Sequence, residues 1–316
     1  MLACLHCLIT IQRRFYAPGL KDKCYSYHCS GCQKNKLLGP GYGLLPPRHA
    51  PLVPWNEVAI DLIGPWGIKI QNEEVEFNAL TCIDPVTNLV EIIRINNRTA
   101  FHVAQQFENC WLSRYPRPNR CVHDNGGEFK GEEFQLMLQR HGIHDSPTTS
   151  RNPQGNAVCE RMHQTVANVL QTTLPLQPPQ NLEQAIQLVE NAIATTVYAT
   201  RCSVSRALNM TPGEIVFQRD MFVDLPVVAD LLAIRDKRQG LIDENLRRLN
   251  RKRREFQYEI GGEVLIKAVD PRKLEPKAHG PYTITRVFQN GTIEVRRNPQ
   301  VVERLNIRRV IPFRRN

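Results

Sequence analysis

In the first third of the chain, apolar residues form three short stretches, and the residues after these have apolar positions at the spacing of a helix. Residues 57–63, 77–84 and 89–95 are rich in Val, Ile, Leu and Thr and are separated by turn-forming residues, which predicts three strands. Because the connections are short, we expect antiparallel neighbours. Residues 99–115 then place apolar side chains on one stripe, which predicts an amphipathic helix.

The middle of the chain continues with alternating short strands and helices. A strand is predicted over 120–123, a helix over 132–141 and a further strand over 143–145. The pair Asn152-Pro153 can begin another helix, because proline is tolerated in a first turn. Strands followed by alternating helices and strands are typical of an α/β core with a mixed sheet.

The helix that begins near Pro153 has an apolar side and a polar side. Its apolar side recurs at the spacing of a buried stripe and consists of Val158, Met162, Val166 and Val169. The other side carries Glu160, His163, Gln164 and Gln171. This pattern predicts that Glu160 points away from its own helix's core, toward solvent or toward a cleft.

The last part of the chain changes character twice. Residues 182–201 have an amphipathic pattern, and residues 230–259 are typical of a long charged helix. Residues 260–316 turn to short β stretches with glycine-rich turns, consistent with a small five-stranded barrel. No stretch reaches the roughly 18 apolar residues that span a bilayer, so no membrane partner is expected.

Charge and cysteine content narrow the functional class. Residues 1–56 carry 7 basic and 1 acidic residue, residues 57–234 carry 13 and 20, and residues 235–316 carry 21 and 10. Basic ends around an acidic middle favour a polyanion such as nucleic acid as partner, with solubility alone as the alternative. Five of the ten cysteines lie in the first 32 residues and the others are scattered, which argues against a disulfide framework.

Three carboxylates carry the candidate chemistry. Asp61 lies inside an apolar stretch, Asp124 directly follows a predicted strand, and Glu160 lies on a predicted helix, with 35 residues between Asp124 and Glu160. A carboxylate in a buried strand is costly unless it is paired or binds a metal, and three together would repel one another without cations. Two divalent metal ions would remove that cost. The alternative for each acid by itself is a solvated or capping residue.

The spacing of these three acids resembles that of the DDE integrases of retroviruses and gypsy-type LTR retrotransposons. Two motifs beside the acids, residues 124–129 and 152–156, resemble the same family. Residues 13–19 leading into 29–33, and the tripeptide 280–282, resemble the same family. The resemblance implies a ribonuclease-H-like core with a mixed five-stranded sheet flanked by helices. It also implies a helical N-terminal zinc-knuckle fragment and a small C-terminal β-barrel. The expected domains are a partial zinc-binding module (1–38), a linker (39–54), the catalytic core (55–222), a charged helical connector (223–259) and a nucleic-acid-binding barrel (260–316).

The resemblance further implies a metal-dependent polynucleotidyl transferase. Asp61 would bind both of two Mg²⁺ or Mn²⁺ ions, Asp124 one of them and Glu160 the other. Paired metals can stabilise the attacking and leaving oxygens of an in-line phosphoryl displacement, and oxygen ligands suit these ions rather than zinc. The enzyme would trim the 3′ ends of element DNA and join them to target DNA. It would act in the nucleus as a homo-oligomer, and a chromatin partner could bind the C-terminal module.

A second metal site is predicted at Cys29 and Cys32, as ligands of zinc. The family's module also needs two upstream histidines, and counting back from Phe15 the second would fall near Met1 and the first before the chain begins. We therefore expect a truncated or rebuilt module. Structural zinc takes four ligands, so the set remains open: the other candidates are Cys4, Cys7, Cys24 and His28. The alternative is a pair of free thiols.

Candidate DNA contacts fall in two places. Arg161, His163 and Gln164 follow Glu160 on its helix and could contact the element's end, with an ordinary solvated helix face as the alternative. A basic run in the charged connector could bind phosphates or direct nuclear import, or be only a soluble helix. Its residues are Arg251, Lys252, Arg253 and Arg254.

Two other functions remain open at this point. A catalytically inactive or host-adopted DNA-binding relic of an integrase would keep the basic ends, and the missing histidines favour it. A ribonuclease-H-type hydrolase would share the fold and the metals. The presence of all three acids favours the integrase over the relic, and residues 280–282 with the 35-residue gap between Asp124 and Glu160 favour it over the hydrolase.

Overall fold

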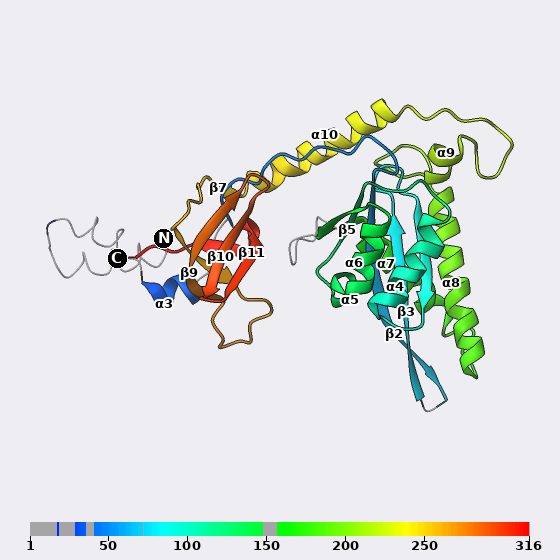
Figure 1. The fold of residues 1–316 in the computed structure, drawn as a ribbon, viewed down its shortest axis with the longest axis horizontal. Coiled ribbons are helices and arrows are strands. Elements are labelled where there is room, and N and C mark those ends of the chain that lie inside the picture. The colour runs from blue at the N-terminus through cyan, green and yellow to red at the C-terminus, as the bar shows by residue number, and fades with distance from the viewer. Residues whose placement is uncertain (1–17, 19–28, 36–40, 72, 148–156, 316) are drawn as a thin grey trace. The chain divides into compact units, whose positions relative to one another are not determined.

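The structure is a computed structural model that describes residues 18, 29–35, 41–71, 73–147 and 157–315, with the backbone alone for 157–161. The chain divides into two compact units. We call residues 48–244 the core unit and residues 1–47 together with 245–316 the outer unit (Figure 1). In the part of the chain that the structure describes, no helix has both the length and the apolar character needed to cross a membrane.

The core unit is built on a mixed five-stranded sheet with the strand order β4-β3-β2-β5-β6. Strand β3 pairs antiparallel with both β2 and β4, whereas β5 lies parallel to both β2 and β6. The predicted α/β class is therefore confirmed. The strands are β2 (Glu57–Ile70), β3 (Glu73–Ile83), β4 (Val90–Ile95), β5 (Arg120–His123) and β6 (His144–Pro147).

Strand β2 is twice as long as the sequence pattern predicts, because a break in its pairing accommodates Gly64 and Pro65. The register with β3 shifts between Ile63 and Trp66, and pairing then resumes to the end of both strands. Gly64 has a φ of 107° there, and a Cβ on it would lie 2.5 Å from the carbonyl oxygen of Phe77. Only glycine fits such a close approach with positive φ.

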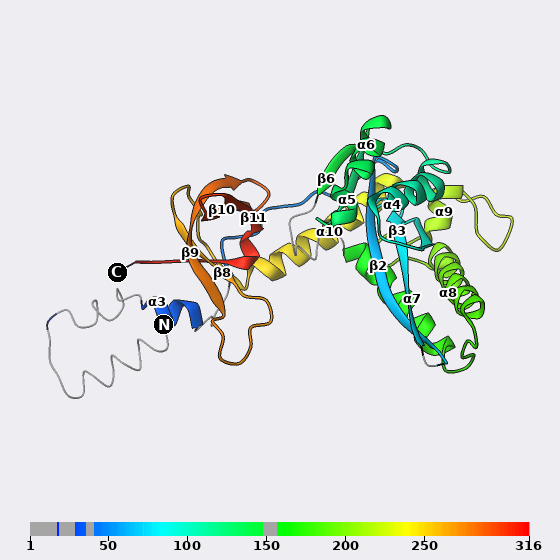
Figure 2. The same cartoon turned by 60° about the horizontal axis from the view of Figure 1, so that its bottom comes forward.

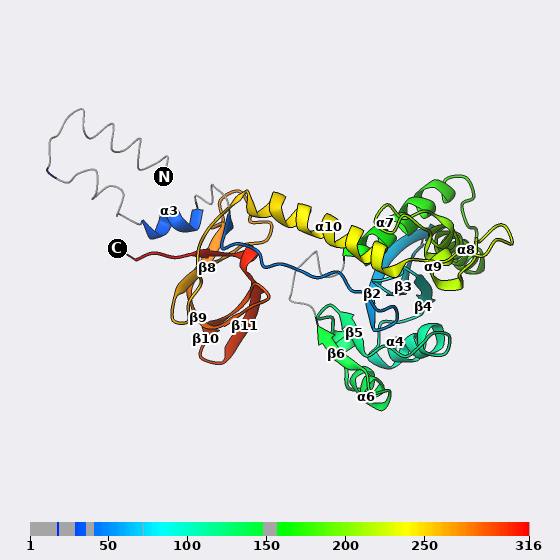
Figure 3. The same cartoon turned by 90° about the horizontal axis from the view of Figure 1, so that it is seen from above.

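Helices cover both faces of this sheet (Figure 3). One apolar cluster joins β2, β3 and β4 to α7 and α8, and a second joins the other face of the sheet to α4, α5 and α6. Alternate β2 residues enter the two clusters: Ala59 and Ile63 lie on the α7 side, Val58 and Ile60 on the α4 side. The helices are α4 (Ala100–Phe107), continued by a π-helical turn (Glu108–Leu112), α5 (Gly127–Lys130), α6 (Glu132–Arg140), α7 (Ala157–Thr173), α8 (Leu182–Cys202) and α9 (Pro212–Phe217).

The outer unit contains a second five-stranded sheet, antiparallel throughout, with the order β11-β10-β9-β8-β12 (Figure 2). A separate apolar cluster packs against this sheet. The β structure predicted for residues 260–316 is therefore confirmed. Its strands are β8 (Glu263–Lys267), β9 (Ala278–Phe288), β10 (Thr292–Asn298), β11 (Val301–Asn306) and β12 (Val310–Pro312), with a 3₁₀ turn (Ile307–Arg309) before β12. The short helix α3 (Ser30–Asn35) also belongs to this unit.

The charged helix α10 (Leu231–Asn250) ends earlier than the predicted 259. Its last residue explains the end: the Asn250 amide donates to the Leu45 carbonyl oxygen at 3.0 Å and accepts from the Leu45 N–H at 2.8 Å. The chain then enters β7 (Arg253–Arg254), which pairs parallel with β1 (Gly41–Tyr42). Part of the predicted basic helix is therefore a strand.

Candidate active site

Asp61 lies in the middle of β2, as predicted, and is half-buried. It follows the alternation of Ala59 and Ile63, so its side chain belongs to the α7 side of the sheet. Its Oδ1 accepts the Leu62 N–H at 3.0 Å. Its pairing partner on the neighbouring strand β3 is Thr81. The Thr81 hydroxyl is buried and has no hydrogen-bond partner among the described residues.

Asp124 directly follows β5 and is exposed. Strand β5 pairs parallel with β2, with Glu57 opposite Arg120 and Ala59 opposite Val122. Continued by two residues, the same register would bring Asp124 level with Asp61, and adjacent strands lie about 4.8 Å apart in a sheet. The fold therefore brings Asp61, within β2, near Asp124, just after β5, although they are 63 positions apart in the sequence.

Glu160 lies on α7, near its beginning. Partly buried Met162 and buried Val166 and Leu170 of this helix pack in the cluster that covers the Asp61 side of the sheet. The helix that carries Glu160 thus lies on the same face as Asp61. The side chains of Glu160 and Arg161 lie outside the described part of the structure, so their predicted roles remain predictions.

The loop after Asp124 is closely packed around a second carboxylate. Asp124 Oδ1 accepts the Gly126 N–H at 2.9 Å, and Glu128 is held 3.6 Å from Arg98. A Cβ on Gly126 would lie 2.8 Å from Glu128 Oε2 and 3.0 Å from Asp124 Oδ1, whereas a Cβ on Gly127 would meet nothing within 4 Å. The two glycines of this motif therefore differ: a side chain at the first would have to displace the carboxylates beside it.

The oxygen donors at this site suit a hard divalent cation. Asp61 supplies a carboxylate from within β2, and Asp124 supplies one just after the neighbouring strand β5. Mg²⁺ and Mn²⁺ prefer such donors. Among the side chains that the structure describes, no three His, Cys, Asp or Glu groups lie close enough to hold a metal, and Glu160 is outside that set.

The predicted zinc ligands Cys29 and Cys32 lie at the beginning of α3. The Cys32 N–H points to Cys29 Sγ at 3.4 Å, a contact typical of Cys-x-x-Cys turns. The other candidate ligands, Cys4, Cys7, Cys24 and His28, lie outside the described residues. The zinc site remains a prediction.

Sequence reasoning missed a buried histidine next to Asp124. His123 is 1% exposed, and its ring contacts the Asp124 carbonyl oxygen on one side and the Asp145 carboxylate on the other. A histidine beside a candidate metal ligand was a visible signal. Its partner could not be found without the pairing of β5 with β6.

The predicted DNA contacts differ in exposure. Gln164 is exposed and donates to Asn168 Oδ1 at 2.9 Å. His163, which the helical pattern predicted on the polar side of α7, has a half-buried ring: its Nε2 has no partner in the described part, and burial lowers its pKa to about 4. The reason is its position one turn before buried Val166, at the edge of the apolar stripe.

The residues of the basic run in the connector also differ in exposure. Arg251 and Lys252 are exposed, and Arg254 stacks over the Tyr42 ring with Cζ 5.6 Å from its centroid. Arg253 is half-buried, and its guanidinium donates to backbone carbonyls. Three of the four residues are therefore accessible to a phosphate.

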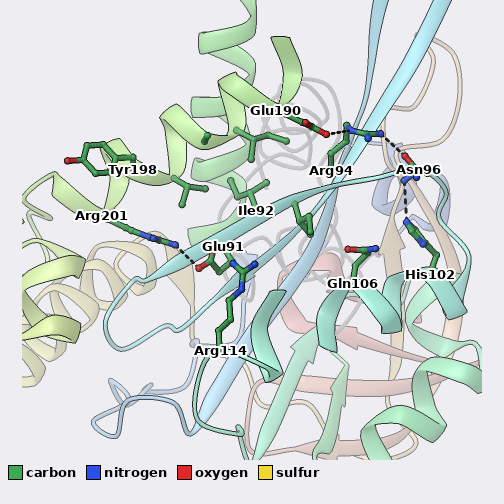
Figure 4. A pocket seen from close by; sticks show the side chains of 14 residues that line it. Glu91, Ile92, Arg94, Asn96, His102, Gln106, Arg114, Glu190, Tyr198 and Arg201 are labelled. Atoms are coloured by element: carbon green, nitrogen blue, oxygen red, sulfur yellow. Dashed lines mark hydrogen bonds and ion pairs between the residues drawn. The ribbon is translucent and has the colours of Figure 1, made fainter. Parts of the chain in front are cut away.

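A depression of about 650 Å³ lies elsewhere in the core unit, between β4, α4 and α8 (Figure 4). On its floor Arg201 pairs with buried Glu91 at 2.6 Å, and the Tyr115 hydroxyl donates to the same carboxylate. At its rim Arg94 pairs with Glu190 at 3.0 Å. None of the predicted catalytic residues lines it.

Comparison with known proteins gives relatives in sequence and in structure, while no family model matches. The chain is 24% identical over 211 residues to the Transposon Tf2-3 and Tf2-4 polyproteins of Schizosaccharomyces pombe, a match that covers 65% of this chain. It spans 15% of the length of these relatives. Among solved structures, the simian T-cell lymphotropic virus intasome in complex with PP2A regulatory subunit B56 gamma aligns with a TM-score of 0.64 at 12% identity, over 97% of this chain and 94% of that chain.

Proposed function

We propose that this chain, an integrase of the DDE, ribonuclease-H-like superfamily by its sequence relatives and its fold, trims the 3′ ends of an element's DNA and joins them to target DNA. Relatedness to retrotransposon polyproteins and the integrase fold support a general role in DNA integration. The end processing and the metal mechanism belong to the proposal.

One observation carries the proposal: the parallel register of β2 with β5. It brings Asp61 and Asp124 to adjacent strand positions, on a sheet whose same face is covered by the helix that carries Glu160. A single catalytic acid has many explanations. Asp61 within β2 and Asp124 just after β5, with a third acid on a helix that packs on the same face of the sheet, would supply the arrangement that the chemistry needs.

Asp61, Asp124 and Glu160 would hold two Mg²⁺ or Mn²⁺ ions. When bound, these ions stabilise the charge on the attacking and leaving oxygens of a phosphodiester. The chain's own contribution is to fix the ligands: β2 holds Asp61, and the Gly126 N–H orients the Asp124 carboxylate. The Thr81 hydroxyl across from Asp61 is buried and has no hydrogen-bond partner among the described residues, so it could donate to a reoriented Asp61 carboxylate.

DNA would bind through the basic ends of the chain and the exposed polar face of α7. Arg251, Lys252 and Arg254 are accessible in the connector, and Arg161 and Gln164 follow Glu160 on its helix. Each phosphate neutralised releases counterions, so binding should weaken steeply with salt. We further propose action in the nucleus, as a homo-oligomer, with a chromatin partner for the C-terminal sheet.

The test is a joining reaction. The purified chain is incubated with Mg²⁺ or Mn²⁺, a labelled duplex that carries the parent element's terminal repeat, and plasmid DNA. Joined products should form with the wild type and with Glu132→Gln, an exposed acid outside the predicted set. They should disappear with Asp124→Asn and with Glu160→Gln.

Two results would overturn the proposal. Tight, salt-sensitive DNA binding without cutting or joining would identify a DNA-binding relic. Hydrolysis of an RNA–DNA hybrid in place of joining would identify a ribonuclease-H-type hydrolase.

A further inference from the structure

His123 is fixed in the core unit more firmly than a strand-terminal residue requires. It is the last residue of β5 and only 1% exposed. Its ring packs against Phe129, with centroids 5.0 Å apart, and edge-on against Phe134, with centroids 6.0 Å apart. Both phenyl rings belong to the apolar cluster beneath the sheet. The imidazole therefore has one defined orientation.

Both ring nitrogens of His123 face oxygen atoms. Nδ1 lies 2.5 Å from the Asp124 carbonyl oxygen, and Nε2 lies 2.5 Å from Asp145 Oδ1. A carbonyl oxygen and a carboxylate oxygen both only accept, so each ring nitrogen carries a proton and donates it, as in the doubly protonated imidazole. The second hydrogen bond anchors the ring to β6, which pairs parallel with β5.

Asp124 is consequently held at two points. Its carbonyl oxygen accepts from His123, and its side-chain Oδ1 accepts the Gly126 N–H at 2.9 Å. With the backbone fixed on one side and the carboxylate on the other, little torsional freedom is left to the candidate metal ligand. The carboxylate is otherwise exposed, at the point where strand pairing with β2 has ended.

We propose that His123 and Asp145 form a positioning pair for Asp124: the pair fixes the backbone from which the metal-binding carboxylate projects. The inference rests on the proposed function of Asp124 as a metal ligand. Neither residue touches DNA or metal in this proposal. Residues that orient a metal ligand through a hydrogen bond typically change metal affinity or activity by roughly 10- to 100-fold when they are replaced.

The experiment uses the full chain and two measurements. Mn²⁺ affinity is measured by titration calorimetry, and hydrogen exchange of the peptide that covers Asp124 to Gly127 is measured without metal. The variants are Asp145→Ala, Asp145→Asn, His123→Ala and the double variant. Asp145→Asn keeps an oxygen acceptor for Nε2. His141→Gln is the control, because His141 also pairs with an acid, Glu108 at 2.8 Å, on a different part of the unit.

We expect Asp145→Ala to bind Mn²⁺ roughly 10- to 100-fold more weakly and to exchange faster at the Gly126 amide. Asp145→Asn should retain more affinity than Asp145→Ala, and the double variant should lose no more than His123→Ala, because the two residues act in series. Circular dichroism identifies any variant that fails to fold, and the half-exposed Asp145 side chain allows the Asp145 variants to keep the core intact.

The proposal is overturned if folded Asp145→Ala matches the wild type in Mn²⁺ affinity and in exchange, or if His141→Gln changes both as much. Failure of the proposed function looks different. In that case the wild type binds no Mn²⁺, yet exchange at Gly126 still rises in Asp145→Ala if the pair positions this loop.

Discussion

The Nε of Arg253 donates to the carbonyl oxygen of Gly43 at 2.6 Å. The same guanidinium donates to the Tyr42 carbonyl at 2.5 Å and to the Ile307 carbonyl at 3.4 Å, and a Cβ on Gly41 would lie 2.4 Å from its Nη1. Arg253 thus links β7, in which it lies, to the β1 segment and to the turn that precedes β12. A residue from the basic run is structural.

Because Arg253 is structural while Arg251 and Lys252 are exposed, substitutions in this run should affect either stability or DNA binding. Arg253→Ala should destabilise the outer unit by about 1–3 kcal/mol, since three carbonyl acceptors lose a charged donor. Arg251→Ala and Lys252→Ala should instead weaken DNA binding, and each should lower the slope of log K against log salt by about 1. Calorimetric unfolding and filter binding over a salt series measure the two effects. A reduced salt slope with unchanged stability in Arg253→Ala would contradict the assignment.

The paired glycines after Asp124 give a matched test of carboxylate placement. Gly126→Ala introduces a Cβ within 3.0 Å of Asp124 Oδ1 and 2.8 Å of Glu128 Oε2, while Gly127→Ala meets nothing within 4 Å. We expect Gly126→Ala to lower the joining rate by roughly 10- to 100-fold, because small misplacements of reacting groups have effects of that size. Gly127→Ala should stay within a few-fold of the wild type. Equal rates for the two variants would show that the Asp124 carboxylate tolerates displacement.

Much of the fold could be predicted from local patterns, and the departures have physical causes. The strand with Asp61 and the helix with Glu160 follow from apolar periodicity. The extension of β2 to Ile70 did not, because Gly64 and Pro65 signal a turn in isolation; the register shift that accommodates them depends on β3. Strand pairing is a property of two segments, and a pattern within one segment does not contain it.

At the candidate site, too, residue types could be predicted from local sequence, whereas their contacts could not. Asp61 and Asp124 could be predicted as residue types at a spacing, but their closeness depends on the β2–β5 register. The link from His123 to Asp145 spans 22 positions and two strands. His163 was predicted on the polar side of α7 because helical periodicity assigns faces and not depth. The sheet on which the helix packs decides how far a residue at the edge of its apolar stripe is buried.

The depression between β4 and α8 contains two ion pairs of unequal burial, which predicts unequal energies. The Glu91 side chain is 9% exposed and accepts from both Arg201 and Tyr115, whereas the Glu190 side chain is 48% exposed and pairs with Arg94. Glu91→Ala leaves Arg201 without its buried partner and should cost about 2–4 kcal/mol. Glu190→Ala should cost less than about 1 kcal/mol.

Urea unfolding followed by tryptophan fluorescence measures this contrast, because all three tryptophans, Trp55, Trp66 and Trp111, lie in the core unit. The outer unit does not contribute to that signal. Similar losses of unfolding free energy in the two variants would show that burial does not set the strength of these pairs.

Burial of His163 predicts a dependence of core-unit stability on pH. Desolvation lowers the pKa of His163 to about 4, below the ordinary value of about 6.5 expected in the unfolded chain. Between these values the unfolded chain binds the extra proton, so stability rises with pH. The contribution of His163 is complete above about pH 6.5 and is lost as the pH falls toward 4. His163→Gln, which does not titrate, should flatten the unfolding free energy over this window relative to the wild type, while His144→Gln, at an exposed position on β6, should not. Parallel pH profiles for the wild type and His163→Gln, measured by the same tryptophan signal, would mean that the imidazole gains its proton without unfolding the helix around it.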